Sequence, residues 1–195
     1  TGVQTCALPI SFDFDRDLSQ DYLQYGRDYF DNPGIPEGYG GYTYDGRYRS
    51  VAEKMCTHYD LQPGDRVLEI GCAKGFILVE FQKLGMDVAG IDVSAYAVND
   101  AHPAVKDAIR LGDAAVLPFE NNAFDLVFGK EVLPHVPETS ARKMIQECMR
   151  VSKGPIFFEI QCGKTKQECA DMLRWDKTHQ IAQSPDRKST RLNSS

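Results

Sequence analysis

The stretch VLEIGCAKG, residues 67–75, joins an apolar run to a turn that contains two glycines. Residues 66–70 have the length and composition of a buried strand. Residues 74–84 have the pattern of a helix that ends at Gly85 in a C-cap position. Gly71 and Gly75 allow positive φ angles and a close approach of a ligand to the backbone. The stretch therefore predicts a strand, a tight turn and a helix, with a ligand site at the turn.

The alternation of strand and helix continues along the chain. Further strands are predicted at 87–92, 108–112, 124–129 and 155–160, and further helices at 94–101, 138–151 and 164–175. Strands that alternate with helices of this length imply right-handed crossovers and a parallel sheet covered on both faces. The predicted fold class is therefore α/β, with a doubly wound, Rossmann-like sheet.

The remaining segments differ from this core, which is assigned to residues 61–175. Residues 11–60 are predicted to form an N-terminal helical lid, in which Leu18, Tyr22, Tyr25 and Tyr29 fall at helical spacing and 47–59 forms a second helix. Residues 176–195 are expected to be an irregular tail. Residues 1–10 and 187–195 fit no neighbouring pattern and resemble peptides translated from sequencing-adapter DNA, which predicts two non-native ends. Two ordinary disordered tails are the alternative.

Composition narrows the class of protein. The formal net charge of the 195 residues is -6, which argues against a nucleic-acid binder with a basic face. No apolar run approaches the roughly 20 residues that span a bilayer, and no secretory signal is visible. None of the six cysteines forms a C-x-x-C pair, so no metal site is predicted. A reduced, cytoplasmic protein is the simplest interpretation.

Three acidic residues follow predicted strands. Glu69 ends a buried strand, where a carboxylate is costly unless a hydrogen bond or a cationic group satisfies it. Asp92 ends the second strand, where a carboxylate can accept hydrogen bonds from both hydroxyls of a ribose. Asp113 follows the third strand. Dinucleotide-binding enzymes have a carboxylate at a similar distance along the chain after the first strand. Asp92 therefore indicates adenosine binding but does not indicate which cofactor carries the adenosine.

Four segments in order resemble the class I S-adenosylmethionine-dependent methyltransferases, in the form of a methyltransferase type 11-like domain. The first motif of that family is an acidic residue, one residue, Gly, three residues and Gly, which Glu69, Gly71 and Gly75 match. The other three segments are Gly112-Asp113-Ala114, then Leu117-Pro118-Phe119 with Phe124-Asp125-Leu126-Val127, and finally residues 129–135. The resemblance covers 66–136 and extends more loosely through Ile160.

The resemblance implies about five parallel strands in the order 3-2-1-4-5, with S-adenosylmethionine bound at their ends. The family usually has seven strands, and the last two are predicted to be missing here, which would leave 155–160 as an exposed apolar edge. In the lid, Tyr44 or Tyr48 would contact the sulfonium or methionine chain, and Arg47 would pair with the methionine carboxylate. Packing of these tyrosines on the sheet is the alternative. The predicted cofactor-binding residues are Glu69, Gly71, Cys72, Ala73, Gly75, Asp92, Val93, Asp113, Ala114, Lys130, Tyr44 and Arg47.

The predicted function is methyl transfer to O, N or C of a small molecule. His135 is the candidate general base, and a structural role in packing or capping is its alternative. Glu131 and Lys130 are weaker candidates, and Lys130 would line the cofactor pocket. An NAD-dependent oxidoreductase is a second interpretation, although Ala73 replaces the central glycine of its motif. A non-catalytic cofactor-binding fragment is the third. The sequence predicts neither the acceptor nor the oligomeric state.

Overall fold

The computed structural model describes residues 17–182, and its centre is a five-stranded sheet. The strands are β1 (Arg66–Ile70), β2 (Asp87–Asp92), β3 (Ile109–Leu111), β4 (Leu126–Lys130) and β5 (Ile156–Glu159). Their order across the sheet is β3-β2-β1-β4-β5, and every neighbouring pair is parallel. The predicted fold class and strand order are confirmed.

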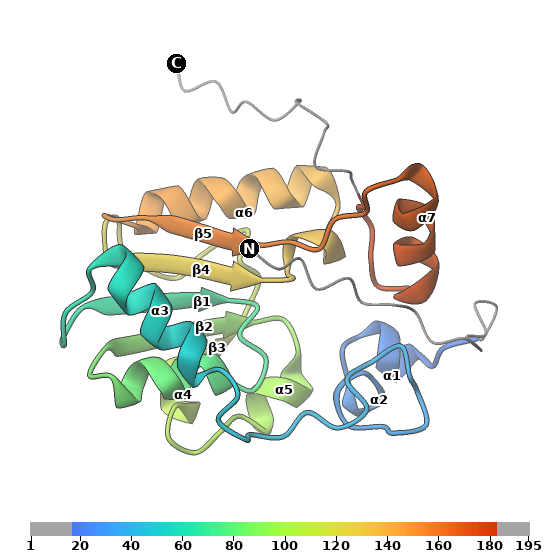
Figure 1. Ribbon diagram of the computed structural model, residues 1–195, viewed down its shortest axis with the longest axis horizontal. Coiled ribbons are helices and arrows are strands. Elements are labelled where there is room, and N and C mark those ends of the chain that lie inside the picture. Colours follow the sequence, from blue (N-terminus) through green and yellow to red (C-terminus); the bar gives the residue numbers. More distant parts are fainter. Residues whose placement is uncertain (1–16, 183–195) are drawn as a thin grey trace.

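Parallel pairing brings the carboxyl ends of the strands to one side of the sheet. Ile70 at the end of β1 pairs with Ile91 on β2 and with Gly129 on β4. Asp92, the next residue of β2, is the partner of Leu111 at the end of β3. The residues that follow β1, β2, β3 and β4 therefore lie along the same side of the molecule, toward which the arrows point in Figure 1.

Helices cover both faces of the sheet. Their bounds are α1 (Gln20–Leu23), α2 (Arg27–Phe30), α3 (Arg49–Tyr59), α4 (Phe76–Lys83), α5 (Ala95–Asn99), α6 (Glu138–Val151) and α7 (Lys166–Trp175), with short 3-10 turns η1 (Lys106–Ala108) and η2 (Leu133–His135). On one face, α3 and α4 bury Met55 and Phe81 against Phe128 of β4. On the other, α6 buries Met144 and Cys148. Each face thus has its own apolar core, as doubly wound sheets require.

The N-terminal segment differs from the continuous helix that the spacing of Leu18, Tyr22, Tyr25 and Tyr29 predicted. Two short helices, α1 and α2, are separated by Tyr25, whose φ of 55° is left-handed, and by Gly26. The Asp21 carboxylate accepts a hydrogen bond from the backbone N–H of Asp28 at 2.7 Å, and a Cβ on Gly26 would lie 2.1 Å from it. The turn therefore interrupts the helical spacing. Residues 11–16 lie outside the described part of the chain.

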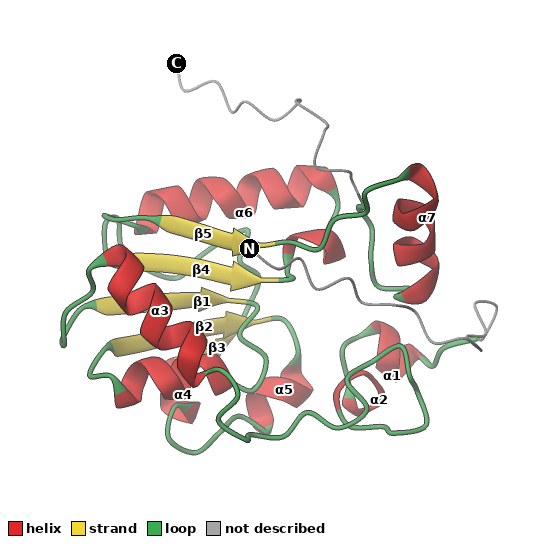
Figure 2. Cartoon of the chain, in the orientation of Figure 1, coloured by secondary structure: helices red, strands yellow, loops and turns green. Residues whose placement is uncertain are grey.

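Beyond the strand ends, α1 and α2 lie on the same side of the molecule as α7 (Figure 2). Helix α7 begins with a capping box between Thr165 and Glu168. At the β5 edge, Phe157 and Ile160 are exposed, as predicted for this strand. Among residues 17–182, no helix combines the length and apolar character needed to cross a bilayer.

Candidate cofactor and acceptor site

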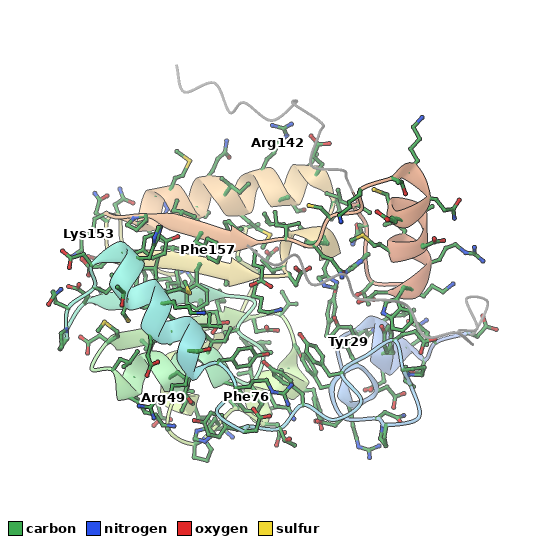
Figure 3. All side chains as sticks on the ribbon, viewed as in Figure 1. Tyr29, Arg49, Phe76, Arg142, Lys153 and Phe157 are labelled. Atoms are coloured by element: carbon green, nitrogen blue, oxygen red, sulfur yellow. The ribbon has the colours of Figure 1, made fainter. Side chains whose placement is uncertain are left out.

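A cavity of about 330 Å³ opens at the carboxyl ends of the strands. Its floor comes from the turns after β1, β2, β3 and β4, and its roof comes from the N-terminal segment. Figure 3 shows Tyr29, on α2, on the side toward which the strands end. The lining residues are Leu23, Tyr25, Tyr29, Phe30, Tyr39, Ile70, Gly71, Ala73, Ile91, Asp92, Val93, Gly112, Asp113, Ala114, Lys130, Glu131, Val132, His135, Val136, Met144 and Gln180. Its volume lies within the range of small-molecule sites.

The two glycines of the turn after β1 have the positive φ angles that the sequence predicted. Gly71 has a φ of +67° and Gly75 a φ of +75°. A Cβ on Gly71 would lie 2.8 Å from a methyl of Val132, and a Cβ on Gly75 would lie 2.5 Å from a methyl of Ile109. Gly71 thus lines the cavity, whereas Gly75 lets the start of α4 pack on the end of the sheet.

Asp92 holds this turn against the cavity. One carboxylate oxygen accepts from the backbone N–H of Ala73 at 2.7 Å, and the other accepts from that of Ser94 at 2.8 Å. Burial raises the pKa of Asp92, and the backbone donors oppose that shift. Each carboxylate oxygen has two lone-pair sites, so both oxygens keep capacity for a ligand. Asp92 therefore positions the loop and offers acceptors to the cavity.

Glu69 lies close to this site but does not line the cavity. Its side chain is fully buried, and its Oε2 has no hydrogen-bond partner among the described residues. Burial raises its pKa well above the usual range, the charge of Asp92 adds to the shift, and Lys130 opposes it. A buried carboxyl without a partner is costly as an anion, so the surroundings favour its protonated form.

Four more of the residues predicted for the cofactor also lie at the cavity. Val93, Asp113, Ala114 and Lys130 all line the cavity. Asp113 is exposed, and one of its oxygens accepts from the backbone N–H of Ala115 at 2.8 Å. Lys130 forms an ion pair with Glu159 at 3.5 Å. The turn after β3 therefore presents a second carboxylate to the cavity, separate from Asp92.

Tyr44 and Arg47 lie elsewhere, so the structure corrects their predicted place at the cofactor. The Tyr44 hydroxyl hydrogen-bonds Glu80 and Lys83 on α4, because the loop that carries it runs along that helix. Arg47 pairs with Asp45 at 2.7 Å, and its side chain is 58% exposed.

Two further residues, both in the turn after β1, pack behind the cavity. Cys72 is buried beside Leu78 and Val79 of α4. Gly75 faces Ile109 and Val105. Both residues therefore shape the loop without lining the cavity.

The cavity roof consists of aromatic residues that the sequence did not assign to the site. Tyr25, Tyr29, Phe30 and Tyr39 line the cavity. The spacing of Leu18, Tyr22, Tyr25 and Tyr29 was the signal that a helical segment buries this face.

A buried ion pair ties the roof to the core. The Lys74 ammonium lies 2.6 Å from Asp31 and 2.8 Å from Asp100, and it donates to the carbonyl of Tyr42 at 3.0 Å. The Lys74 side chain is only 5% exposed. Lys74 therefore links the turn after β1 to the N-terminal segment.

His135, on η2, also lines the cavity. Burial lowers its pKa to about 4, which Asp176 opposes and His179 reinforces. Its ring is therefore neutral at pH 7 and is able to accept a proton. The neighbouring Glu131 is half-buried, and burial raises its pKa.

A second cavity of about 180 Å³ adjoins the first and shares Tyr29, Tyr39, Glu131 and His135 with it. Its other lining residues include Asp176 and His179, which the sequence analysis assigned to an irregular tail. Gln180 donates its backbone N–H to the carbonyl of Pro134 at 2.7 Å. Residues 176–182 therefore pack against the turn after β4, and only this tertiary contact brings them to the site. The side chains of His135, Asp176 and His179 each have one atom of a type that binds metal ions, and these three atoms lie within 4.8 Å of one another.

A parallel sheet with glycine and carboxylate residues at its carboxyl ends defines a Rossmann-like, doubly wound α/β protein. Residues 68–155 match the model of a methyltransferase domain family. The chain is 34% identical over 103 residues to a ubiquinone biosynthesis O-methyltransferase of Paraburkholderia phymatum, covering 49% of this chain and 44% of the relative. It is 33% identical over 123 residues to a 2-methyl-6-phytyl-1,4-hydroquinone methyltransferase of Synechocystis, covering 60% of this chain and 38% of the relative.

Solved structures show the same fold. The YcgJ protein of Bacillus subtilis matches with a TM-score of 0.59 and 21% identity, covering 70% of this chain and 63% of that one. A putative S-adenosyl-L-methionine-dependent methyltransferase of Methanococcus maripaludis matches with a TM-score of 0.52 and 20% identity, covering 65% of this chain and 63% of that one.

Residues 68–155 resemble a methyltransferase domain, and the fold is that of the solved structures named above. The comparisons do not support the alternative of an NAD-dependent oxidoreductase. The chain spans less than half the length of these two curated relatives.

Proposed function

We propose that this chain binds S-adenosylmethionine in the larger cavity and transfers its methyl group to O, N or C of a small-molecule acceptor. The observation that carries the proposal is the convergence of the Gly71 turn, Asp92 and Asp113 on one cavity at the carboxyl ends of the strands. This is where doubly wound sheets bind nucleosides.

The residues of the cavity fit that cofactor. Asp92 keeps lone pairs for two ribose hydroxyls after its bonds to Ala73 and Ser94. Asp113 is an acceptor for the adenine amino group, beside Ala114. A side chain on Gly71 would collide with Val132, so only a glycine leaves this backbone open. The aromatic residues of the roof offer π faces of the kind that attract a sulfonium cation.

When bound, the cofactor supplies a methyl group on a sulfonium that is already activated for displacement. The chain's contribution is to orient the acceptor and to exclude water, an effect worth about 7–11 kcal/mol in well-oriented reactions. An acceptor hydroxyl or ammonium must also lose a proton. His135 is the proposed base, because it lines both cavities and is neutral at pH 7, although its lowered pKa also weakens it as a base. Glu131 and Lys130 are the weaker candidates.

Calorimetric titration tests the proposal. The chain is expected to bind S-adenosylhomocysteine with a stoichiometry of one and to give no heat with NADH. Incubation with methyl-labelled S-adenosylmethionine and a panel of phenols, amines and activated carbon acids then identifies the acceptor atom by mass. Absence of binding to the demethylated product would refute the proposal. Binding without transfer to any acceptor would favour a non-catalytic cofactor-binding domain.

We also propose a cytoplasmic location and partners limited to small molecules. The five described cysteines are free, which supports a reducing compartment. The net charge of -6 argues against a nucleic-acid partner. Localisation of a tagged chain and a filter-binding assay with RNA and DNA are the respective tests.

A further inference from the structure

A chain of hydrogen bonds leads from the N-terminal segment to His135 through two residues that follow α7. The Tyr22 hydroxyl donates to the Asp176 carboxylate at 3.2 Å. The Thr178 hydroxyl contacts the same carboxylate oxygen at 2.6 Å, and Nδ1 of His135 lies 2.8 Å from the Thr178 hydroxyl oxygen. Asp176 and Thr178 are both about 6% exposed. The contacts join segments that lie 43 to 154 residues apart in the sequence.

The proton positions in this chain follow from the donors around Asp176. Its Oδ1 also faces the backbone N–H of Thr178 at 2.8 Å, which can only donate. Burial and the Asp176 charge raise the pKa of Tyr22, so that phenol keeps its proton and donates as well. A carboxylate surrounded by donors acts as an acceptor throughout. The Thr178 hydroxyl therefore gives its single proton to Asp176.

Thr178 can then only accept from its other neighbours. Its oxygen has two lone pairs, and one of them faces Nδ1 of His135 at 2.8 Å. His135 must therefore carry its proton on Nδ1, because a neutral imidazole has one N–H and one bare nitrogen. The bare nitrogen is Nε2.

We propose that Asp176 and Thr178 are positioning residues that hold His135 in the Nδ1-protonated tautomer and leave Nε2 free to take the acceptor's proton. This proposal rests on the proposed methyl transfer. As the acceptor takes the methyl group and the carbon–sulfur electron pair stays on sulfur, its proton passes to Nε2. The positive charge lost from the sulfonium thus reappears on the imidazolium, near Asp176. This is the arrangement by which a carboxylate orients a catalytic histidine, with a threonine hydroxyl placed between the two.

Nitrogen-15 NMR of the labelled chain tests the tautomer without any turnover. The chain has four histidines, and the missing signals of His135→Gln assign the ring of interest. The wild-type ring is expected to show a protonated Nδ1 and a bare Nε2 at pH 7.5. Thr178→Val, which keeps the side-chain volume but removes the hydroxyl, is expected to shift the ring toward the Nε2-protonated form. Thr178→Ser is expected to restore the wild-type pattern.

Two outcomes would overturn the proposal. The first is a protonated Nε2 in the wild-type ring. The second is a Thr178→Val variant that folds, as judged by its thermal unfolding, and keeps the wild-type nitrogen shifts. The tautomer and the proposed function are tested separately. A chain that does not bind S-adenosylhomocysteine refutes the proposed function and the role of His135 as base. The NMR result alone decides which nitrogen of His135 carries the proton.

With an acceptor in hand, kinetics supply a second readout. Thr178→Val is expected to lower kcat by about 10- to 100-fold, which is part of the roughly 100- to 10,000-fold that general base catalysis contributes. Its dissociation constant for S-adenosylhomocysteine is expected to stay within twofold of wild type, since Thr178 is not among the residues that line the larger cavity. An unchanged kcat would contradict the role of Thr178.

Discussion

Replacing Asp92 by asparagine removes one acceptor from the centre of the cofactor site while preserving its shape. In the wild-type chain, one oxygen accepts from Ala73 and the other from Ser94. In the variant, the amide nitrogen cannot accept from a backbone N–H, so one loop contact and one ligand contact are lost together.

The magnitude follows from these contacts. A hydrogen bond to a charged group contributes about 1.5–3 kcal/mol. Loss of the ligand contact therefore weakens binding of S-adenosylhomocysteine by about 10- to 100-fold, because 1.36 kcal/mol corresponds to a factor of ten. The effect on stability is smaller. Burial already disfavours the ionised form of Asp92, so a neutral amide recovers part of what the lost loop contact costs.

Isothermal titration calorimetry measures the binding, and thermal unfolding without ligand measures the stability. Asp87→Asn is the matched control, since Asp87 begins the same strand, is exposed and does not line the cavity. We expect the control to bind like the wild type. If Asp92→Asn binds within twofold of the wild type, or if the control loses as much affinity, Asp92 does not hold the cofactor.

Three further results are expected. Gly75→Ala should lower the free energy of unfolding by about 1–3 kcal/mol more than Gly64→Ala. Both positions have positive φ, but only a Cβ on Gly75 would have side-chain atoms within 4 Å. Chemical denaturation measures both variants, and equal losses would contradict the packing argument. Lys74→Met should destabilise the chain by about 1–3 kcal/mol and loosen the N-terminal segment, because it leaves the Asp31 carboxylate and the Tyr42 carbonyl without their donor. Lys153→Met, which removes a half-exposed ammonium from its ion pair with Asp125, should cost under about 1 kcal/mol. Hydrogen exchange of residues 20–42 reports the loosening, and unchanged exchange would count against it. Folding lowers the pKa of His135 from 6.5 to about 4, so the unfolded chain binds the proton more tightly. The free energy of unfolding should therefore fall as the pH drops from about 6.5 to 4. Relative to His135→Gln, this loss should reach at most about 3 kcal/mol, and parallel pH profiles of the two proteins would refute it.

Much of the cavity lining could be predicted because the residues that indicate it lie close together in the sequence. A strand, a glycine turn and a helix follow one another within residues 66–84. Asp92 and Asp113 follow predicted strands, and parallel strands deliver their carboxyl ends to one side of a sheet. The strand order came from the resemblance, and the structure confirms it.

Side-chain direction was less accessible to the sequence. Tyr44 was predicted to face the cofactor, yet it contacts Glu80 and Lys83 on α4. A tyrosine in a loop rich in glycine has no periodicity that fixes the face it presents. The break between α1 and α2 had the same cause, because the Asp21 carboxylate and the turn at Gly26 outweigh the helical spacing of the aromatic residues.

The sequence by itself determined the strands, the glycine turn and the two carboxylates that follow β2 and β3, since each of these features depends on residues close together in the chain. Only the tertiary structure decided the surroundings of His135 at the cavity. Tyr22 and Asp176 stand 154 positions apart, and Thr178 and His135 stand 43 apart. No periodicity or motif links residues at such separations, because their contact arises from the packing of the N-terminal segment and the residues after α7 against the same ends of the strands.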